Sequence, residues 1–382
     1  MNWTEAGQKV LNQLEESGFD SYIVGGAVRD KLIGKVVMDV DICTKATVEE
    51  IQSVFLRTIE VGIQHGTVIV PIRGFPVQVS TFKGNTLEED LLQRDFTINA
   101  MAENRLGDII DPLGGKKDLH KRLIRSVTNT SQPFEKDPLR LLRALRFALQ
   151  FHFHIEERTQ EGMNSFSHLM NSPAIERISA ELEKISTCSL DGEQWTWLLD
   201  QPVFQQLNSL FQNHELKRSL KAQERPVVIQ DYLTWWSFAL YDEDVSLVKN
   251  GLSHYKRSNR LSKDVIAIHQ SISQLKQGYC TSYDLYKLGK TRLTIALHLL
   301  NHLQQKQTDE TTLLNAYDHL PIKEKKEILI TGRDILDHFP SYAGHEVGQL
   351  IKDIERNVVS GQLHNEQQAI LDWIRRKERN ED

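Results

Sequence analysis

The sequence predicts a small α/β head followed by an all-helical remainder. Within the first 125 residues, short runs of β-branched residues alternate with segments of helical periodicity, which predicts a mixed sheet with helices packed on it. From about residue 134 onward the strand signal fades, and long periodic segments separated by short polar stretches take over. A chain of 382 residues is long enough for two to four domains.

The elements of the head follow from local patterns. Val10, Leu11 and Leu14 share one side of a helix, and Thr47 is a suitable N-cap because acids follow it in the first helical turn. The expected order is a helix over 5–17, strands over 21–24 and 36–42, a helix after Thr47, and strands over 68–72 and 77–82.

The composition is that of an ordinary globular protein, with 40% hydrophobic and 26% charged residues. No apolar run approaches the ~18 residues of a membrane span, and the N-terminus lacks the pattern of a secretion signal. The three cysteines are too far apart for a disulfide framework or a zinc site. We therefore expect a cytoplasmic protein with no membrane partner.

Two aspartates separated by one residue carry the most specific chemical signal. Asp39 and Asp41 lie in the strand expected over 36–42, and residues two apart on a strand point to the same face. Because like charges repel, two carboxylates in one small space need a divalent cation or a shared proton. Two Mg²⁺ ions roughly 3.5–4 Å apart are a common solution in phosphoryl and nucleotidyl transfer. The alternative is a strand end with two solvated acids.

A glycine turn precedes this strand. Gly25 and Gly26 would let backbone N–H groups approach a phosphate closely. Arg29 then offers a planar fork to a triphosphate oxygen. A plain glycine turn is the alternative.

A helix beginning near Pro138, with Asp137 as its cap, separates two kinds of side chain. Leucines gather on one side, and a slanted row on the other side consists of Asp137, Arg140, Arg143 and Arg146. Asp137 can accept the N4 amine of cytosine while Arg140 serves its N3 and O2 acceptors. The two side chains would then imitate a Watson–Crick partner. The alternative is an exposed amphipathic helix.

A second polar pair lies between the acid pair and this helix. Asp95 and Asn99 are four residues apart, which places them on one face of a helix, where they could hold ribose hydroxyls. Alternatively, Asp95 caps that helix.

The run Gly25-Gly26-Ala27-Val28-Arg29-Asp30, followed by Asp39 and Asp41, resembles the nucleotidyltransferases of the DNA polymerase β superfamily. Within it, the chain resembles the class II tRNA nucleotidyltransferases and the related bacterial poly(A) polymerases. This resemblance implies an α/β nucleotidyltransferase (DNA polymerase β-like) head followed by an all-α neck, body and tail. The implied ranges are a catalytic head over 1–125, a neck with the base-reading helix over 126–190, a body over 191–275 and a tRNA-binding tail over 276–382.

The resemblance also implies roles for the candidate residues. Asp39 and Asp41 would be catalytic and hold Mg²⁺, and Asp137 with Arg140 would read the base. Nucleotide-binding residues would be Gly25, Gly26, Arg29, Arg94, Asp95, Asn99, Arg143 and Arg146. Two positions depart from the family pattern: Lys136 replaces a usual glutamate, for which Glu135 is the available substitute, and Gln78 replaces an acid found in many relatives. We therefore expect Asp39 and Asp41 alone as protein ligands of the metal.

The segment before Asp95 is short. Twelve residues, 83–94, separate Phe82 from Asp95, whereas relatives that build the full C-C-A end carry a longer flexible segment there. The short form resembles CC-adding enzymes, although loops also vary in length without consequence. The expected reaction is addition of CC from CTP to the 3′ end of a tRNA that lacks it, with release of pyrophosphate. A separate A-adding enzyme would then act on the product.

Three alternatives remain open: complete CCA addition, which would also use ATP; a poly(A) polymerase; and a non-catalytic RNA-binding protein. The net charge of −6 argues against binding nucleic acid through overall charge. RNA binding would depend on local basic clusters, which lie at 116–125, 140–146, 256–263 and 375–379.

Overall fold

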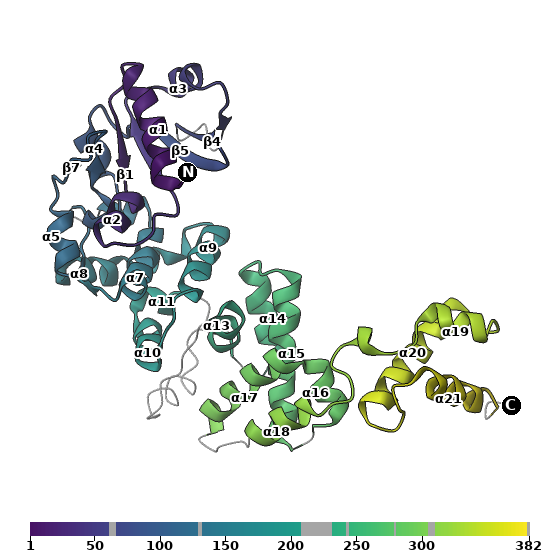
Figure 1. Ribbon diagram of the computed structural model, residues 1–382. Helices are drawn as coiled ribbons and strands as arrows, with labels where there is room; N and C mark the ends of the chain where they lie inside the picture. The colour runs from purple at the N-terminus through teal and green to yellow at the C-terminus, as the bar shows by residue number, and fades with distance from the viewer. Residues whose placement is uncertain are drawn as a thin grey trace. The chain divides into compact units, whose positions relative to one another are not determined.

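The computed structural model describes residues 1–60, 66–128, 132–207, 231–241, 244–278, 280–304 and 310–379. Contacts divide the chain into two compact units. The first consists of residues 1–188 with 200–207, and the second of residues 189–199 with 208–382. The first unit holds the α/β head and the helices that follow it, and the second is helical in its described residues (Figure 1). The predicted fold class is thereby confirmed.

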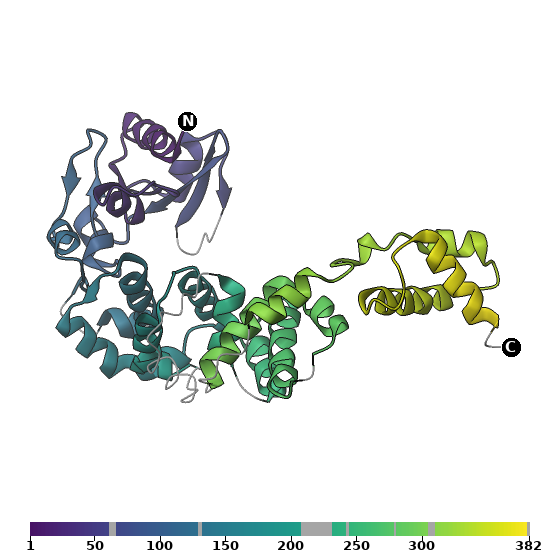
Figure 2. The same ribbon diagram turned by 60° about the horizontal axis from the view of Figure 1, so that its bottom comes forward.

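A mixed sheet forms the centre of the head. Its strand order is β3-β4-β5-β2-β1-β6-β7, and β2 and β5 are parallel while the other neighbours are antiparallel. The strands are β1 (Ser21–Val24), β2 (Asp41–Thr44), β3 (Ile59–Glu60), β4 (Thr67–Ile72), β5 (Phe75–Thr81), β6 (Ala102–Glu103) and β7 (Ile109–Ile110). Of the central strands, β1 ends directly before the glycine turn and β2 begins at Asp41, the second acid of the pair. Figure 2 shows the head from a second direction.

The strand β2 is shorter than predicted, because its ladder begins at Asp41 and residues 36–40 lie outside it. The backbone nevertheless keeps the alternation of a strand at this point. Val40 is buried at 2% exposure, and its carbonyl accepts the N–H of Gln78 at 3.2 Å. With Val40 pointing into the core, the flanking Asp39 and Asp41 point away from it.

Helices cover the sheet of the head. The helix α1 (Trp3–Glu16) begins at a capping box formed by Asn2 and Glu5 and packs against β1 and β5. As predicted, Thr47 caps α3 (Val48–Val54). The remaining helical turns of the head are α2 (Gly26–Leu32), α4 (Leu87–Leu92), η2 (Thr97–Asn99) and α5 (Gly115–His120).

The helical part of the first unit is built around α7 (Leu139–Phe151), whose leucines are buried as predicted. This helix begins one residue later than predicted, with Pro138 rather than Asp137 at the cap position. The surrounding helices are α6 (Gln132–Lys136), α8 (Glu157–Phe166), η3 (Ser167–Asn171), α9 (Ile175–Ser186) and α11 (Pro202–Gln205). A small parallel ladder of β8 (Leu123–Ile124) and β9 (His154–Ile155), not predicted, joins the head to these helices.

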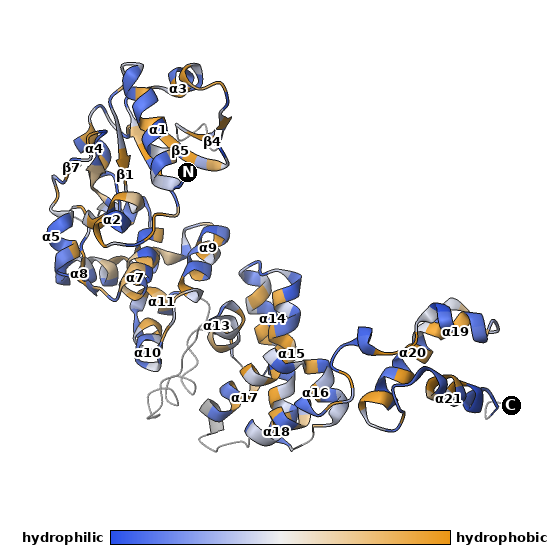
Figure 3. Ribbon diagram, in the orientation of Figure 1, coloured by the Kyte–Doolittle hydropathy of each residue, from blue (hydrophilic) through white to orange (hydrophobic). Residues whose placement is uncertain are grey.

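The second unit has its own aromatic core. Trp195, Trp235, Trp236 and Tyr255 are fully buried, and neighbouring ring centroids lie 4.9–5.7 Å apart. The helices among its described residues are α10 (Gly192–Asp200), α13 (Tyr232–Ala239), α14 (Val245–His254), α15 (Asn259–Lys276), α16 (Ser282–Leu288), α17 (Lys290–Gln304), α18 (Glu310–Asp318), η5 (Lys325–Glu327), α19 (Gly332–His338), α20 (Gly344–Val359) and α21 (Gln367–Arg379). Several of these helices carry both apolar and polar residues along their length (Figure 3). Among the described residues, no helix has the length and apolar character needed to cross a membrane.

Candidate active site

One pocket of the first unit, with a volume of about 540 Å³, is lined by all twelve residues that the sequence suggested for the site. A volume of this size suits a nucleotide. The twelve are Gly25, Gly26, Arg29, Asp39, Asp41, Arg94, Asp95, Asn99, Asp137, Arg140, Arg143 and Arg146. Six further lining residues were not suggested: Asp30, Lys83, Gln93, Phe147, Gln150 and Lys184.

The acid pair opens into this pocket. Asp39 is exposed and Asp41 is half-buried at the first position of β2. Burial raises the pKa of Asp41, the Asp39 carboxylate raises it further, and Arg94 opposes both effects. An uncompensated pair of carboxylates is therefore costly here, and a cation between them would remove the cost.

The donor set of this pair fits a hard divalent cation. Mg²⁺ is commonly bound through one or two carboxylates plus substrate phosphates, and it keeps several of its waters. Among the described residues, no group of three or more His, Cys, Asp and Glu side chains is arranged to hold a metal ion. Gln78 is the register partner of Asp41 on β5, but it does not line the pocket. Asp39 and Asp41 are thus a pair of lining carboxylates that could hold such a cation.

The glycine turn forms another wall of the pocket. Gly25 has φ = 72°, and a Cβ there would lie 3.0 Å from Nη1 of Arg94, so only glycine fits without strain. Arg29, one turn into α2, is 7% exposed and donates from Nη1 to Oδ1 of Asn99 at 2.6 Å. Its guanidinium also lies 4.6 Å from the ring centroid of Phe151. The side chain is therefore already oriented before any ligand binds.

Asp95 and Asn99 are brought together, but not on the α-helix that was predicted. Asp95 precedes the 3₁₀ turn η2 and Asn99 is its last residue, and Nδ2 of Asn99 donates to Oδ1 of Asp95 at 2.9 Å. The Oδ2 atom of Asp95 accepts Nε and Nη2 of Arg143 at 2.9 and 2.6 Å. Burial alone would raise the pKa of Asp95, but Arg143 and the hydrogen bonds outweigh it and hold this pKa below its usual value. Asp95 is thus an ionised partner of Arg143.

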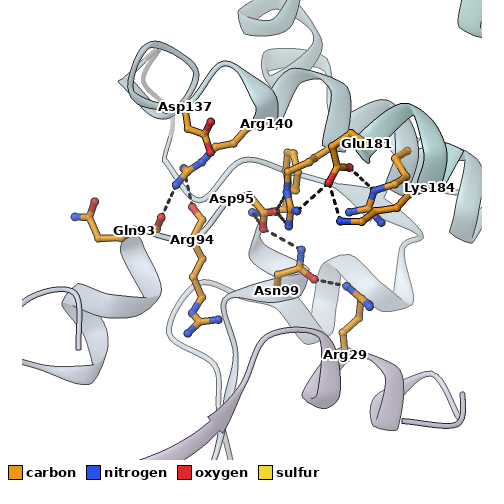
Figure 4. A network of polar contacts seen from close by, with 12 residues as sticks. Arg29, Gln93, Arg94, Asp95, Asn99, Asp137, Arg140, Glu181 and Lys184 are labelled. Atoms are coloured by element: carbon orange, nitrogen blue, oxygen red, sulfur yellow. Dashed lines mark hydrogen bonds and ion pairs between the residues drawn. The ribbon is translucent and has the colours of Figure 1, made fainter. Parts of the chain in front are cut away.

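Two arginines of α7, Arg143 and Arg146, contact a carboxylate that was not singled out as a site residue. Glu181 on α9 is 2% exposed, and its Oε2 accepts Nε of Arg146 at 2.7 Å. Its Oε1 lies 3.5 Å from Nη1 of Arg143 and accepts Nζ of Lys184 at 3.0 Å (Figure 4). Burial alone would raise the pKa of Glu181, but these cations outweigh it and lower the pKa. Glu181 therefore braces α7 as an anion.

Asp137 and Arg140 both line the pocket, and each has a protein partner. Asp137 forms an ion pair with Arg177 of α9 at 3.1 Å rather than capping α7. Arg140 donates from Nη1 to the carbonyl of Arg94 at 2.9 Å and from Nη2 to the carbonyl of Gln93. Glu135, the expected substitute for a bracing glutamate, is exposed and does not line the pocket. Backbone carbonyls therefore orient Arg140.

Two buried acids that sequence reasoning missed, Glu181 and Asp90, share a recognisable signal. Glu181 follows the apolar face of α9 formed by Ile178, Leu182 and Ile185. An acid at such a position must be paired, since a lone buried charge is costly. Asp90 on α4 carries the same signal, whereas Lys83 and Lys184 reach the pocket only through tertiary folding.

The sheet and the pocket at the ends of its central strands define the class of protein, a nucleotidyltransferase with a DNA polymerase β-like head. Comparisons with known proteins agree. A family model described as the poly A polymerase head domain matches residues 21–125. A second, described as tRNA nucleotidyltransferase domain 2, putative, matches residues 229–374. A CCA-adding enzyme of Bacillus cereus (strain AH820) is 32% identical, with 96% of each chain covered. The chain belongs to the family of CCA-adding enzymes, the tRNA nucleotidyltransferases.

Solved structures extend this similarity. The crystal structure of the Bacillus stearothermophilus CCA-adding enzyme in complex with CTP is 27% identical, with a TM-score of 0.77 over 99% of this chain and 98% of that one. The Thermotoga maritima CCA-adding enzyme complexed with tRNA is 22% identical, with a TM-score of 0.69 over 99% and 98%, and shows the shared fold.

Proposed function

We propose that this protein is a template-independent tRNA nucleotidyltransferase that adds CC from CTP to the 3′ end of tRNA and releases pyrophosphate. The observation that carries the reaction type is the single pocket lined by the acid pair, the glycine turn and the arginine row. Family membership supports tRNA as the substrate.

Each part of the pocket has a proposed task. Asp39 and Asp41 hold Mg²⁺ and are the catalytic carboxylates; when bound, the metal would supply charge neutralisation at the phosphates and acidify the attacking hydroxyl. Gly25 and Gly26 allow close approach of the triphosphate. Arg29, Arg94, Arg143 and Arg146 compensate its charge and orient it. Asp95 and Asn99 lie near the ribose, and they also hold Arg143 and Arg29 in place.

Asp137 and Arg140 are proposed to read the base. The guanidinium of Arg140 offers donors to N3 and O2 of cytosine, and the carboxylate of Asp137 accepts from its N4 amine. The ion pair between Asp137 and Arg177 is exposed, with side-chain exposures of 32% and 55%, so its rearrangement on nucleotide binding costs little.

Restriction to CC is supported by the segment over residues 83–94. It is only twelve residues long, and it folds onto the head as α4, with Leu87 and Leu91 buried against the core. Complete CCA addition is the second candidate, because the relatives that match the full length are CCA-adding enzymes. A poly(A) polymerase has less support, because the C-terminal half matches a tRNA nucleotidyltransferase model.

The test is an assay of product length with purified protein and a tRNA that lacks its 3′ end. With CTP alone we expect two added residues, and with CTP plus ATP we still expect two. Efficient addition of a terminal A would establish complete CCA addition instead. Long A-tails on generic RNA would establish a poly(A) polymerase, and absence of any incorporation would leave the RNA-binding alternative.

A further inference from the structure

A single buried carboxylate holds the short segment that precedes η2. Asp90 on α4 is 2% exposed and lies between the buried Leu87 and Leu91 on the inward side of this helix. Its Oδ1 accepts the backbone N–H of Lys83 at 3.0 Å. Its Oδ2 accepts Nε and Nη2 of Arg94 at 3.2 and 2.9 Å. Asp90 therefore ties the beginning of the segment to its end.

The end of this segment in turn holds Arg140. The carbonyls of Gln93 and Arg94 come directly after α4, where backbone acceptors have no partner within the helix. Arg140 reaches across from α7 and donates one N–H to each of these carbonyls (Figure 4). The guanidinium is thereby fixed in orientation, and its remaining N–H donors are left for a ligand in the pocket.

We propose that Asp90 is a positioning residue for base selection, an inference that rests on the proposed function. By fixing the Gln93–Arg94 turn, Asp90 sets the orientation in which Arg140 meets the incoming base. Arg94 belongs to the same turn, because its carbonyl accepts from Arg140 while its side chain lines the pocket beside the acid pair. Through this turn, Asp90 thus affects both the contact of Arg94 with the triphosphate and the contact of Arg140 with the base.

A fixed guanidinium favours cytosine over adenine. Cytosine presents two neighbouring acceptors, O2 and N3, whereas the pairing edge of adenine presents one acceptor beside an amine donor. With the adenine amine at Asp137 in place of the cytosine amine, an arginine that cannot turn away would leave one N–H donor facing the C2–H group of adenine, where it finds no acceptor, and an unmet donor is costly. Loosening the turn would let Arg140 move and would weaken the discrimination.

The test compares kcat/KM for CTP and for ATP in the full-length protein, with truncated tRNA as acceptor. Asp90→Asn keeps the shape of the side chain and the acceptor for Lys83 but removes the charge that holds Arg94. We expect the CTP-to-ATP ratio of kcat/KM to fall about tenfold, the size of effect typical for loss of one charged hydrogen bond. The matched control is Glu88→Gln, which changes an exposed acid on the same helix and should keep the wild-type ratio.

Two further variants make the outcome decisive. Gln93→Gly loosens the same turn at an exposed position, so it should shift the ratio in the same direction even if Asp90→Asn fails to fold. Adding Asp90→Asn to Arg140→Ala should change the ratio no further, because the proposed effect passes through Arg140. A wild-type ratio in both Asp90→Asn and Gln93→Gly, with only the overall rate lowered, would overturn the inference. Failure of the wild-type protein to incorporate any nucleotide would instead overturn the proposed function.

Discussion

At the scale of single residues, the site contains carboxylates whose pKa values are shifted in opposite directions. Asp95 is surrounded by donors and cations, which lower its pKa, whereas Asp41 is half-buried beside another acid, which raises its pKa. Asp95 therefore stabilises the folded protein as an anion, and Asp41 destabilises it as an anion unless a cation is bound. A charged group that destabilises the folded protein in this way is typical of functional sites.

The raised pKa of Asp41 leads to a prediction with a definite sign. A group whose pKa is raised on folding contributes stability at low pH and loses it as the pH rises. Asp41→Asn should therefore raise the stability of the metal-free protein at pH 7 by on the order of 1 kcal/mol. The difference from wild type should disappear as the pH falls below about 4, where Asp is protonated in the unfolded chain too. Thermal unfolding in the presence of a chelator measures both effects.

The same substitution should lower nucleotidyl transfer by about a hundredfold or more, because a proposed metal ligand is lost. The control is Asp39→Asn, which should cost similar activity but stabilise less, since Asp39 is exposed. A lower stability of Asp41→Asn would contradict the electrostatic account.

At the scale of elements, α9 positions α7 through Glu181. Removing one partner of a buried ion pair leaves the other charge uncompensated. Glu181→Gln should therefore destabilise the protein by about 3 kcal/mol, whereas Glu183→Gln at an exposed position of the same helix should have little effect. Urea unfolding of the two variants measures the difference.

The lowered pKa values of Glu181 and Asp95 also set a pH dependence. A group whose pKa is lowered on folding contributes stability that is present above its unfolded pKa and is lost as the pH falls. The stability contributed by this network should be constant down to about pH 5 and decline below about pH 4. In Glu181→Gln that decline should be shallower, and an identical pH profile would show that Glu181 is not the titrating group.

The position of the acid pair depends on close packing between α1 and the residue that lies between the two acids. A Cβ on Gly7 would lie 2.6 Å from Cγ1 of Val40, between Asp39 and Asp41. Gly7→Ala should therefore displace this segment, destabilise the protein by about 1–3 kcal/mol and lower transfer. Gly348→Ala in α20 meets no neighbour within 4 Å and should instead stabilise by about 0.5–1 kcal/mol. If the two substitutions had the same sign, the packing argument would fail.

At the scale of the whole molecule, the net charge of −6 requires that RNA be bound through local clusters. Arg260 and Lys263 on α15 are exposed and belong to one such cluster. Reversing both charges should raise KM for tRNA about tenfold at moderate salt and leave KM for CTP unchanged. Lys9→Glu on the exposed side of α1 is the control, and an unchanged KM for tRNA in the double variant would exclude α15 from the RNA surface.

The sequence by itself determined the fold class, the strand before the glycine turn and twelve of the residues that line the pocket. These features are readable because spacing, turn chemistry and the leucine face of α7 are local properties. The division of the chain into head, neck, body and tail stays a prediction. Contacts divide the chain into two units, and they place the head and residues 126–188 in the same unit.

Only the tertiary structure decided how the charges of the site are paired. Asp95 meets Arg143, and Arg146 meets Glu181, across separations of 48 and 35 residues. Arg140 meets two backbone carbonyls that no side-chain pattern could reveal. The physical reason is that a sequence lists charges in order along the chain, whereas an ion pair depends on distance and burial in space.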